Sequence, residues 1–314
     1  MRITVLAGGV GGARFVRGVR ELDAEVSVVV NTGDDLWLTG LRVCPDLDSI
    51  MYALAGVSDT ERGWGRAGET ERISAELAEW GLGWPWFTLG DLDLATHIAR
   101  TSLLREGLRL TEVTERLSAR WPLGVRLLPA TDDEVETHVV TADGQDLHFE
   151  EWWVRTRAAA AARRFVQRGV ERAHATPEAL AAIADADVVL LAPSNPVVSI
   201  GTILGLPGIR SALRDTEAPV VGVSPIIGGA VVRGMADACL ATIGVGTDAA
   251  AVARHYGARR DGGLLDGWLV DDADAASVAG LRGSGFAADA TGLWMTDAAE
   301  SARIARAALA LVSR

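Results

Sequence analysis

The chain has 314 residues, of which 49% are hydrophobic and 23% charged, a composition typical of a folded globular protein and not of a disordered one. Its 42 acidic and 30 basic side chains give a net charge of −12, which disfavours nucleic acid as a partner. The sequence contains no lysine, which excludes Schiff-base, pyridoxal-phosphate and P-loop lysine chemistry.

Cysteine usage and hydropathy indicate a cytoplasmic protein. Cys44 and Cys239 are far apart in the sequence and form no metal-binding pair, which fits a reducing compartment. No segment approaches about 18 consecutive apolar residues, and the first residues lack the basic start of a signal peptide. We therefore expect a soluble protein without a membrane partner.

The first 55 residues predict strand–helix units of a parallel sheet. Residues 3–7 are β-branched or apolar, four of the next five positions are glycine, and residues 13–21 predict a helix. The apolar run from Glu25 to Val30 is typical of a strand that is buried on both faces. Residues 31–44 are predicted as a loop, after which Pro45 is placed to begin a helix.

The middle of the chain predicts an insert. Seven of the ten tryptophans lie within residues 56–174, together with helical patterns near 70–80, 91–107 and 111–121. Further along, Asp143 and Gly144 separate two alternating segments and so predict a hairpin turn, while the alanine-rich stretch 158–164 is expected to be a linker or a helix. We interpret 56–174 as a substrate-binding region inserted in a single domain, 1–314.

Apolar strands return after Asp187 and recur near residues 220 and 266–270. The predicted fold class is therefore α/β: a Rossmann-like parallel sheet with helices on both faces. The insert is predicted to form a mostly helical, tryptophan-rich subdomain with a small antiparallel hairpin.

Three segments at predicted strand ends carry groups suited to a phosphate ligand. The glycine loop after the first strand offers backbone N–H groups, and Arg14 follows on the first helical turn. Asp34, Asp35, Asp46 and Asp48 follow the second strand and could bind Mg²⁺ beside phosphate oxygens, although helix capping is an alternative role for Asp46. The loops 192–201 and 224–229 add serine, asparagine and glycine, which are equally common in ordinary helix entry.

Several long motifs resemble those of the 2-phospho-L-lactate transferase family of coenzyme F420 biosynthesis. They include GGVGGARF, NTGDDLWLTGLRVCPDLDSIMY, LGDLDLATHIAR, HFEEWWV, LAPSNPVVSIG and SPIIGGAVVRGMAD. The resemblance spans nearly the whole chain and implies a Rossmann-like fold. It also implies transfer of a phosphoenolpyruvyl or 2-phospholactyl group from a guanosine-diphospho-activated donor to the hydroxyl of the deazaflavin Fo, with release of GMP and a requirement for Mg²⁺. The lysine-free, arginine-rich composition favours the phosphoenolpyruvyl donor of actinobacterial members.

This resemblance and the strand-end positions together define the expected site. Asp46 and Asp48 are expected to act in catalysis and to hold Mg²⁺. The residues expected to bind the nucleotide are Gly8, Gly9, Gly11, Gly12, Arg14, Ser194, Asn195, Ser199, Gly201, Ser224 and Gly228. The residues expected to contact Fo are Asn31, Asp35, Trp37, Asp91 and His97. We also expect a homodimer.

Two other functions compete with the transferase. A related group of nucleotide-sugar-binding regulators carries a glycine- and serine-rich stretch after the acidic pair, where this chain has LWLTGLRVCPDLD. An NAD(P)-dependent oxidoreductase is disfavoured because Arg14 occupies the last position of the glycine fingerprint and Asn31 stands where an acidic residue would bind the ribose. Both differences favour the transferase.

Overall fold

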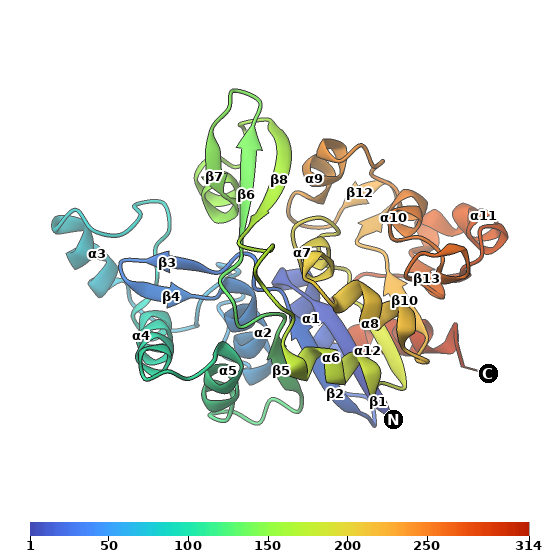
Figure 1. The fold of residues 1–314 in the computed structure, drawn as a ribbon, viewed down its shortest axis with the longest axis horizontal. Coiled ribbons are helices and arrows are strands. Elements are labelled where there is room, and N and C mark those ends of the chain that lie inside the picture. The colour runs from blue at the N-terminus through green and yellow to red at the C-terminus, as the bar shows by residue number, and fades with distance from the viewer. Residues whose placement is uncertain (314) are drawn as a thin grey trace.

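The structure, a computed structural model, describes residues 1–313 and has a seven-stranded parallel sheet at its centre (Figure 1). Its strands are β1 (Arg2–Ala7), β2 (Glu25–Val30), β5 (Arg126–Pro129), β9 (Val188–Leu191), β10 (Val220–Val223), β13 (Gly267–Val270) and β14 (Ala287–Ala290). They lie in the order β14-β13-β10-β9-β1-β2-β5, and every neighbouring pair is parallel. The predicted α/β fold class is confirmed.

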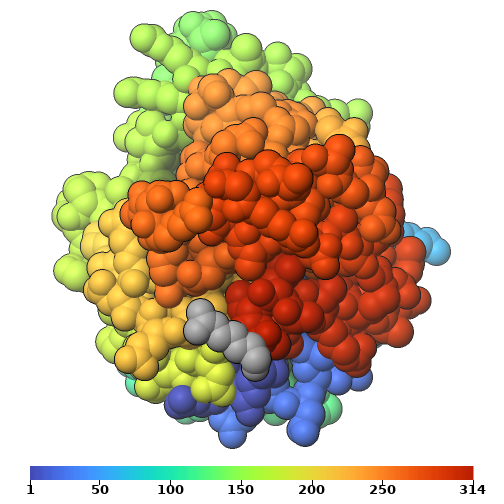
Figure 2. All heavy atoms as spheres, turned by 90° about the vertical axis from the view of Figure 1, so that its right-hand side faces the viewer, coloured from blue at the N-terminus to red at the C-terminus, as the bar shows by residue number. Residues whose placement is uncertain are grey.

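The two faces of the sheet are covered by different helices because successive side chains of a strand point to opposite faces. Val5 and Val28 face one layer, which consists of α1 (Gly9–Val19), α2 (Pro45–Ala55) and α12 (Ala298–Ala310). Leu6 and Val29 face the other layer. That layer consists of α6 (Pro177–Ala184), α7 (Ile200–Gly205), α8 (Ile209–Asp215), α10 (Ala249–Tyr256) and α11 (Val278–Gly283). The C-terminal segments, orange to red in Figure 2, cover one end of the molecule.

A helical region extends from the β2 side of the sheet. It contains α3 (Arg72–Glu79), α4 (Asp91–Arg105) and α5 (Leu110–Ser118), which confirms the three predicted helices. Residues 31–44, predicted as a loop, contain a hairpin of β3 (Leu36–Leu38) and β4 (Leu41–Val43). Its turn consists of Thr39 and Gly40, both with positive φ, which suits the twist of a two-residue hairpin turn.

A second sheet projects above the first one (Figure 1). It is antiparallel, in the order β7-β6-β8, with β6 (Glu136–Thr141), β7 (Asp146–His148) and β8 (Ala162–Arg168). The predicted turn at residues 143–144 joins β6 to β7, but the stretch 158–164 runs into strand β8 and does not form a helix. Strand β5 of the main sheet lies within residues 56–174. The predicted insert is therefore two separate parts, the helical region before β5 and the antiparallel sheet after it.

The remaining elements are short. They are β11 (Ile226–Ile227), β12 (Ala230–Val231), α9 (Ala236–Thr242), a π-helix (Glu151–Arg155) and 3-10 helices at Arg259–Asp261 and Asp272–Ser277. Within residues 1–313, none of the helices combines the length and the apolar character needed to cross a membrane.

Candidate functional site

A cavity of about 440 Å³ lies over the carboxyl ends of the central strands, where ligand sites of open parallel sheets occur. The glycine loop after β1, the start of α2 and the loops after β9 and β10 form its floor. Its walls come from residues 63–65, 86–89, 149–154, 232–236 and 293–296. Segments distant in the sequence therefore meet at this cavity.

The glycine loop has no room for side chains at two of its positions, because neighbouring groups lie in close contact with its backbone. A Cβ atom on Gly8 would lie 2.5 Å from Asp46 Oδ2, and one on Gly11 would lie 2.7 Å from the Pro193 carbonyl oxygen. Helix α1 begins at Gly9, earlier than predicted, so the loop and the first helical turn overlap. The start of α1 therefore lines the cavity, and the first N–H groups of a helix lack partners within the helix.

The predicted polar residues after β9 and β10, Ser194, Asn195 and Ser224, form hydrogen bonds to the backbone of the loops around them. The Gly8 N–H donates to Ser194 Oγ at 3.1 Å, and that hydroxyl donates to the Gly8 carbonyl at 2.7 Å. Asn195 Oδ1 accepts the Val197 N–H at 2.9 Å, and Ser224 Oγ bonds to the backbone two residues further on. All three predicted side chains line the cavity, but each already holds a loop in place.

The other nucleotide residues predicted from the sequence are divided between the cavity and its surroundings. Gly9 and Ser199 line the cavity. Gly12 lies behind it, where a Cβ atom would be 2.8 Å from Ser194 Oγ. Gly201 packs in the first turn of α7, and Gly228 occupies the turn between β11 and β12; neither lines the cavity.

Three buried carboxylates line the cavity and raise one another's pKa, and we call Asp34, Asp46 and Glu150 the carboxylate cluster. Asn31 lies behind this cluster, where its Nδ2 donates to Asp46 at 2.9 Å and to Asp34 at 3.2 Å. Asn31 is fully buried and does not line the cavity, so in this structure it contacts two cluster members, and its contact with Fo stays a prediction. Within residues 1–313, Asp34 Oδ1 has no hydrogen-bond partner.

The carboxylate cluster favours a cation because its members disfavour one another's negative charge. Burial raises the pKa of Asp46 to about 6, although hydrogen bonds from Asn31 and Gly9 lower it. Burial and the nearby Asp46 raise the pKa of Glu150 to about 8. The pKa of Asp34 is raised by burial and then by Asp46 and Glu150. A divalent cation would remove the repulsion that these shifts reflect.

A buried imidazole fixes the position of Glu150. His148, at the end of β7, accepts the Glu150 N–H with its Nδ1 at 3.1 Å. Burial lowers the pKa of His148 to about 4, so the ring is neutral and Nδ1 is an acceptor at neutral pH. The second sheet thereby presents Glu150 to the main sheet. No spacing in the sequence connects Glu150 to Asp34 and Asp46, and the HFEEWW motif was the one available signal.

Asp48 belongs to a different set of contacts, so the predicted pair of Asp46 and Asp48 does not meet at one point. Arg100, 2% exposed, donates to Asp48. His97 lies between two carboxylates, 3.5 Å from Asp48 and 3.4 Å from Asp93, which in turn accepts the Tyr52 hydroxyl at 2.8 Å. The ligating atoms of Asp48, Asp93 and His97 lie within 4.8 Å of one another, but Arg100 already neutralises Asp48.

Besides Asn31, three more residues predicted to contact Fo lie outside the cavity. Asp35 is buried 3.7 Å from Arg42, and burial raises its pKa to about 7. Trp37 is 40% exposed on β3 and donates its indole N–H to Glu134 at 2.9 Å. Asp91, at the start of α4, accepts the backbone N–H of residue 73. Of the predicted Fo residues, only His97 lines the cavity.

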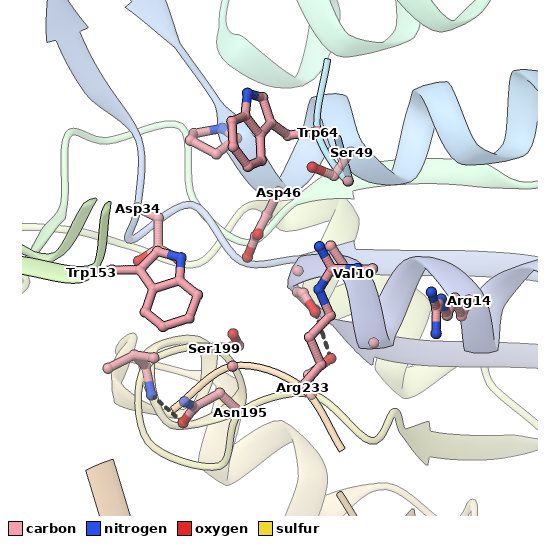
Figure 3. A pocket seen from close by; sticks show the side chains of 18 of the residues that line it. Val10, Arg14, Asp34, Asp46, Ser49, Trp64, Trp153, Asn195, Ser199 and Arg233 are labelled. Atoms are coloured by element: carbon pink, nitrogen blue, oxygen red, sulfur yellow. Dashed lines mark hydrogen bonds between the residues drawn. The ribbon is translucent and has the colours of Figure 1, made fainter. Parts of the chain in front are cut away.

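Other aromatic side chains form an apolar arm of the cavity. Trp64, Trp86 and Phe87 come from the helical region, while Trp153 comes from the π-helix after β7. In Figure 3, Trp64 and Trp153 lie on either side of Asp46. The sequence identified the tryptophan-rich region but not which of its rings face the cavity.

Two arginines provide positive charge at the cavity. Arg14 lies on α1, as predicted, and Arg233 comes from the loop between β12 and α9. Both are exposed, and neither takes part in an ion pair among the residues described. Figure 3 shows them on the side of the cavity away from Asp34 and Trp153. In the sequence, Arg233 is distinguished only as part of the SPIIGGAVVRGMAD motif.

Comparisons with known proteins agree with this architecture. The family model 2-phospho-L-lactate transferase CofD matches residues 3–289. Phosphoenolpyruvate transferase from Streptomyces coelicolor is 56% identical, with 99% of this chain and 98% of that protein covered. The Mycobacterium tuberculosis protein of the same name is 52% identical, covering 98% and 97%.

Solved structures show the likeness of fold at low sequence identity. A crystal structure of a Bacillus halodurans protein of the UPF0052 family has a TM-score of 0.63 at 17% identity, covering 98% of this chain and 100% of that one. A second crystal structure from the same organism gives 0.64 at 18% identity, with 98% and 99% covered. The match over nearly the whole sequence, joined to the close relatives, shows that the chain belongs to the 2-phospho-L-lactate transferase CofD family.

Proposed function

We propose that the chain transfers a phosphoenolpyruvyl group from a guanosine-diphospho-activated donor to the hydroxyl of the deazaflavin Fo, releasing GMP, in coenzyme F420 biosynthesis. The observation that carries this proposal is the division of one cavity into a carboxylate cluster, two free arginines and an aromatic arm. These are the groups that a diphosphate, a divalent cation and a flat ring require. The enolpyruvyl donor is favoured over the lactyl donor because the close relatives are named phosphoenolpyruvate transferases.

The donor diphosphate is placed over the start of α1. Backbone N–H groups of the glycine loop and the helix dipole favour an anion there, and Arg14 and Arg233 add two guanidinium groups. The guanosine then extends toward residues 293–296, above the carboxyl end of β14. This arrangement brings the phosphorus atoms near the carboxylate cluster.

Mg²⁺ fits the carboxylate cluster better than it fits Asp48. Asp46, Asp34 and Glu150 are buried, mutually repulsive and free of guanidinium partners among the residues described, whereas Asp48 is paired with Arg100. We therefore assign the metal to Asp46 with Asp34 and Glu150. When bound, Mg²⁺ would neutralise charge on the donor diphosphate.

In the transfer step, the protein residues align the Fo hydroxyl with the phosphorus and stabilise the charge of the phosphates. The Fo hydroxyl oxygen attacks the phosphorus that carries the three-carbon acid, and the bond from that phosphorus to the bridging oxygen breaks. GMP leaves with the electron pair of this bond, and the hydroxyl proton passes to a carboxylate at the cavity or to water. Trp64 and Trp153 hold the Fo ring so that its hydroxyl points at the phosphorus.

The test is incubation of the purified protein with Fo, the guanosine-diphospho-activated donor and Mg²⁺, followed by mass spectrometry. We expect a mass for Fo joined to the phosphorylated three-carbon acid, together with GMP in equal amount. GDP should also raise the melting temperature, since it binds only the folded state. Stabilisation by nucleotide without any product would instead support a regulatory binding protein. Stabilisation by NAD but not by GDP would support an oxidoreductase.

A further inference from the structure

Arg14 and Arg233, the two arginines at the cavity, differ in the kind of element on which they lie. Arg14 is part of helix α1, which is packed against the sheet. Arg233 lies on an exposed loop between β12 and α9, and its neighbours Val232 and Gly234 also line the cavity. A loop can follow a ligand in a way that a packed helix cannot, so Arg233 is suited to move with the donor.

Arg233 also reaches a loop from the opposite side of the cavity. We call residues 58–66, which carry Trp64, the tip loop. A Cβ atom on Gly63 would overlap the Arg233 guanidinium, so this side chain lies against the tip loop backbone. The base of the tip loop is fixed by Arg66, whose guanidinium lies 5.5 Å from the Trp121 ring centroid. At its other end, Gly63 and Trp64 line the cavity, and Gly63 lies against Arg233.

We propose that Arg233 is a catalytic residue that binds the donor phosphates and, through its contact with Gly63, links donor binding to the position of the tip loop over the acceptor. This inference rests on the proposed function. It predicts an ordered reaction in which the donor binds first. The donor completes a slot that places Trp64 over the acceptor ring.

The chemistry of the step favours a guanidinium at this place. As the acceptor oxygen bonds to phosphorus, the bond to the bridging oxygen breaks and its electron pair stays on GMP. Negative charge therefore grows on the oxygens of the leaving phosphate, on the side away from the attacking hydroxyl. Arg233 lies opposite the carboxylate cluster and can donate two hydrogen bonds to those oxygens.

The first experiment replaces the charge of Arg233. We expect Arg233→Gln to weaken GDP binding by about 10-fold and to lower kcat by about 10²-fold or more, because a phosphate contact that strengthens in the transition state is lost. Guanosine, which lacks phosphates, should bind both proteins equally. The GDP affinity and kcat of Arg233→Lys should lie between those of the wild type and Arg233→Gln, because lysine keeps the charge but not the planar pair of donors. Arg172→Gln, which removes an 85% exposed arginine elsewhere, should match the wild type.

The second experiment tests the contact with the tip loop. Gly63→Ala places a Cβ atom where the Arg233 guanidinium lies, whereas Gly68→Ala adds one to a glycine of similar positive φ with nothing within 4 Å. In wild type and in Gly68→Ala, GDP should tighten Fo binding by about 10-fold. In Gly63→Ala, this effect of GDP should be lost while GDP itself still binds.

The outcomes separate the inference from the function on which it rests. If the wild type binds no GDP and forms no product, the proposed function fails. If the wild type is active and Arg233→Gln matches it in GDP affinity and kcat, Arg233 is not a donor residue. If Fo binds equally with and without GDP, or if Gly63→Ala and Gly68→Ala behave alike, the coupling through the tip loop is wrong.

Discussion

Asp46→Asn should separate stability from activity in the metal-free protein. A pKa of about 6, against the ordinary value of 3.8, means that ionised Asp46 destabilises the fold by about 3 kcal/mol. Asparagine removes this charge, but it has a single acceptor oxygen where Asp46 accepts from both Asn31 and Gly9. One lost hydrogen bond costs about 1 kcal/mol, so the net gain is about 2 kcal/mol. In a chain of 314 residues, this raises Tm by about 3 °C.

The gain must depend on pH in a defined direction. Because the folded-state pKa of Asp46 is raised, the folded protein holds its proton between about pH 4 and pH 6, where the unfolded chain loses it. The wild type therefore loses this part of its stability as the pH rises through about 6, and Asp46→Asn does not. The difference in Tm should be largest above about pH 7, where Asp46→Asn is the more stable protein, and should reverse in sign near pH 4, where folded Asp46 is protonated and only the lost hydrogen bond remains.

The assay is thermal unfolding in EDTA at several pH values, followed by transfer activity with Mg²⁺ restored. We expect Asp46→Asn to melt higher than the wild type at pH 7.5 and to lose activity by orders of magnitude. Asp23→Asn, which removes an exposed carboxylate, should change neither property. An Asp46→Asn protein that melts at or below the wild-type Tm at pH 7.5 would refute the reasoning.

Three further predictions follow from the contacts around the cavity. Arg100→Leu leaves the Asp48 carboxylate buried and unpaired, so urea denaturation should show a loss of about 3–5 kcal/mol, and a loss below about 1 kcal/mol would contradict this. Trp153→Ala should weaken Fo binding several-fold in a fluorescence titration, whereas Trp37→Ala should not; equal effects would reject the assignment of the aromatic arm. Gly11→Ala places a Cβ atom 2.7 Å from a carbonyl oxygen, so GDP should no longer raise Tm, and a retained shift would argue against phosphate at this loop.

The sequence predicted the central sheet because its strands are continuous apolar runs, which are distinctive in a parallel sheet. It missed β5, since the four residues RLLP carry no alternation and sit within a helical region, and it missed β14, whose residues AADA form no strong apolar run. It also placed Trp37 at the acceptor. In the three-residue strand β3, Leu36 and Leu38 are buried, so alternation turns Trp37 outward. The position of such a short strand is decided by packing that the sequence pattern does not show.

The carboxylate cluster shows a different limit of prediction. Asp34 and Asp46 follow the same strand of the main sheet and could be grouped from the sequence. Glu150 arrives from a separate antiparallel sheet, whose placement depends on tertiary contacts of buried groups such as His148. Local patterns define each sheet separately. The relation between the two sheets is visible only in three dimensions.

The pair of hydrogen bonds between Gly8 and Ser194 has a consequence for how the protein folds. These residues are 186 positions apart, and β1 can take its central place only between β2 and β9. Contacts of such long sequence separation form late, because closing a large loop costs chain entropy before the contact stabilises it. The glycine loop should therefore be among the last features to form during refolding, so the return of GDP affinity should lag behind the return of the helical signal.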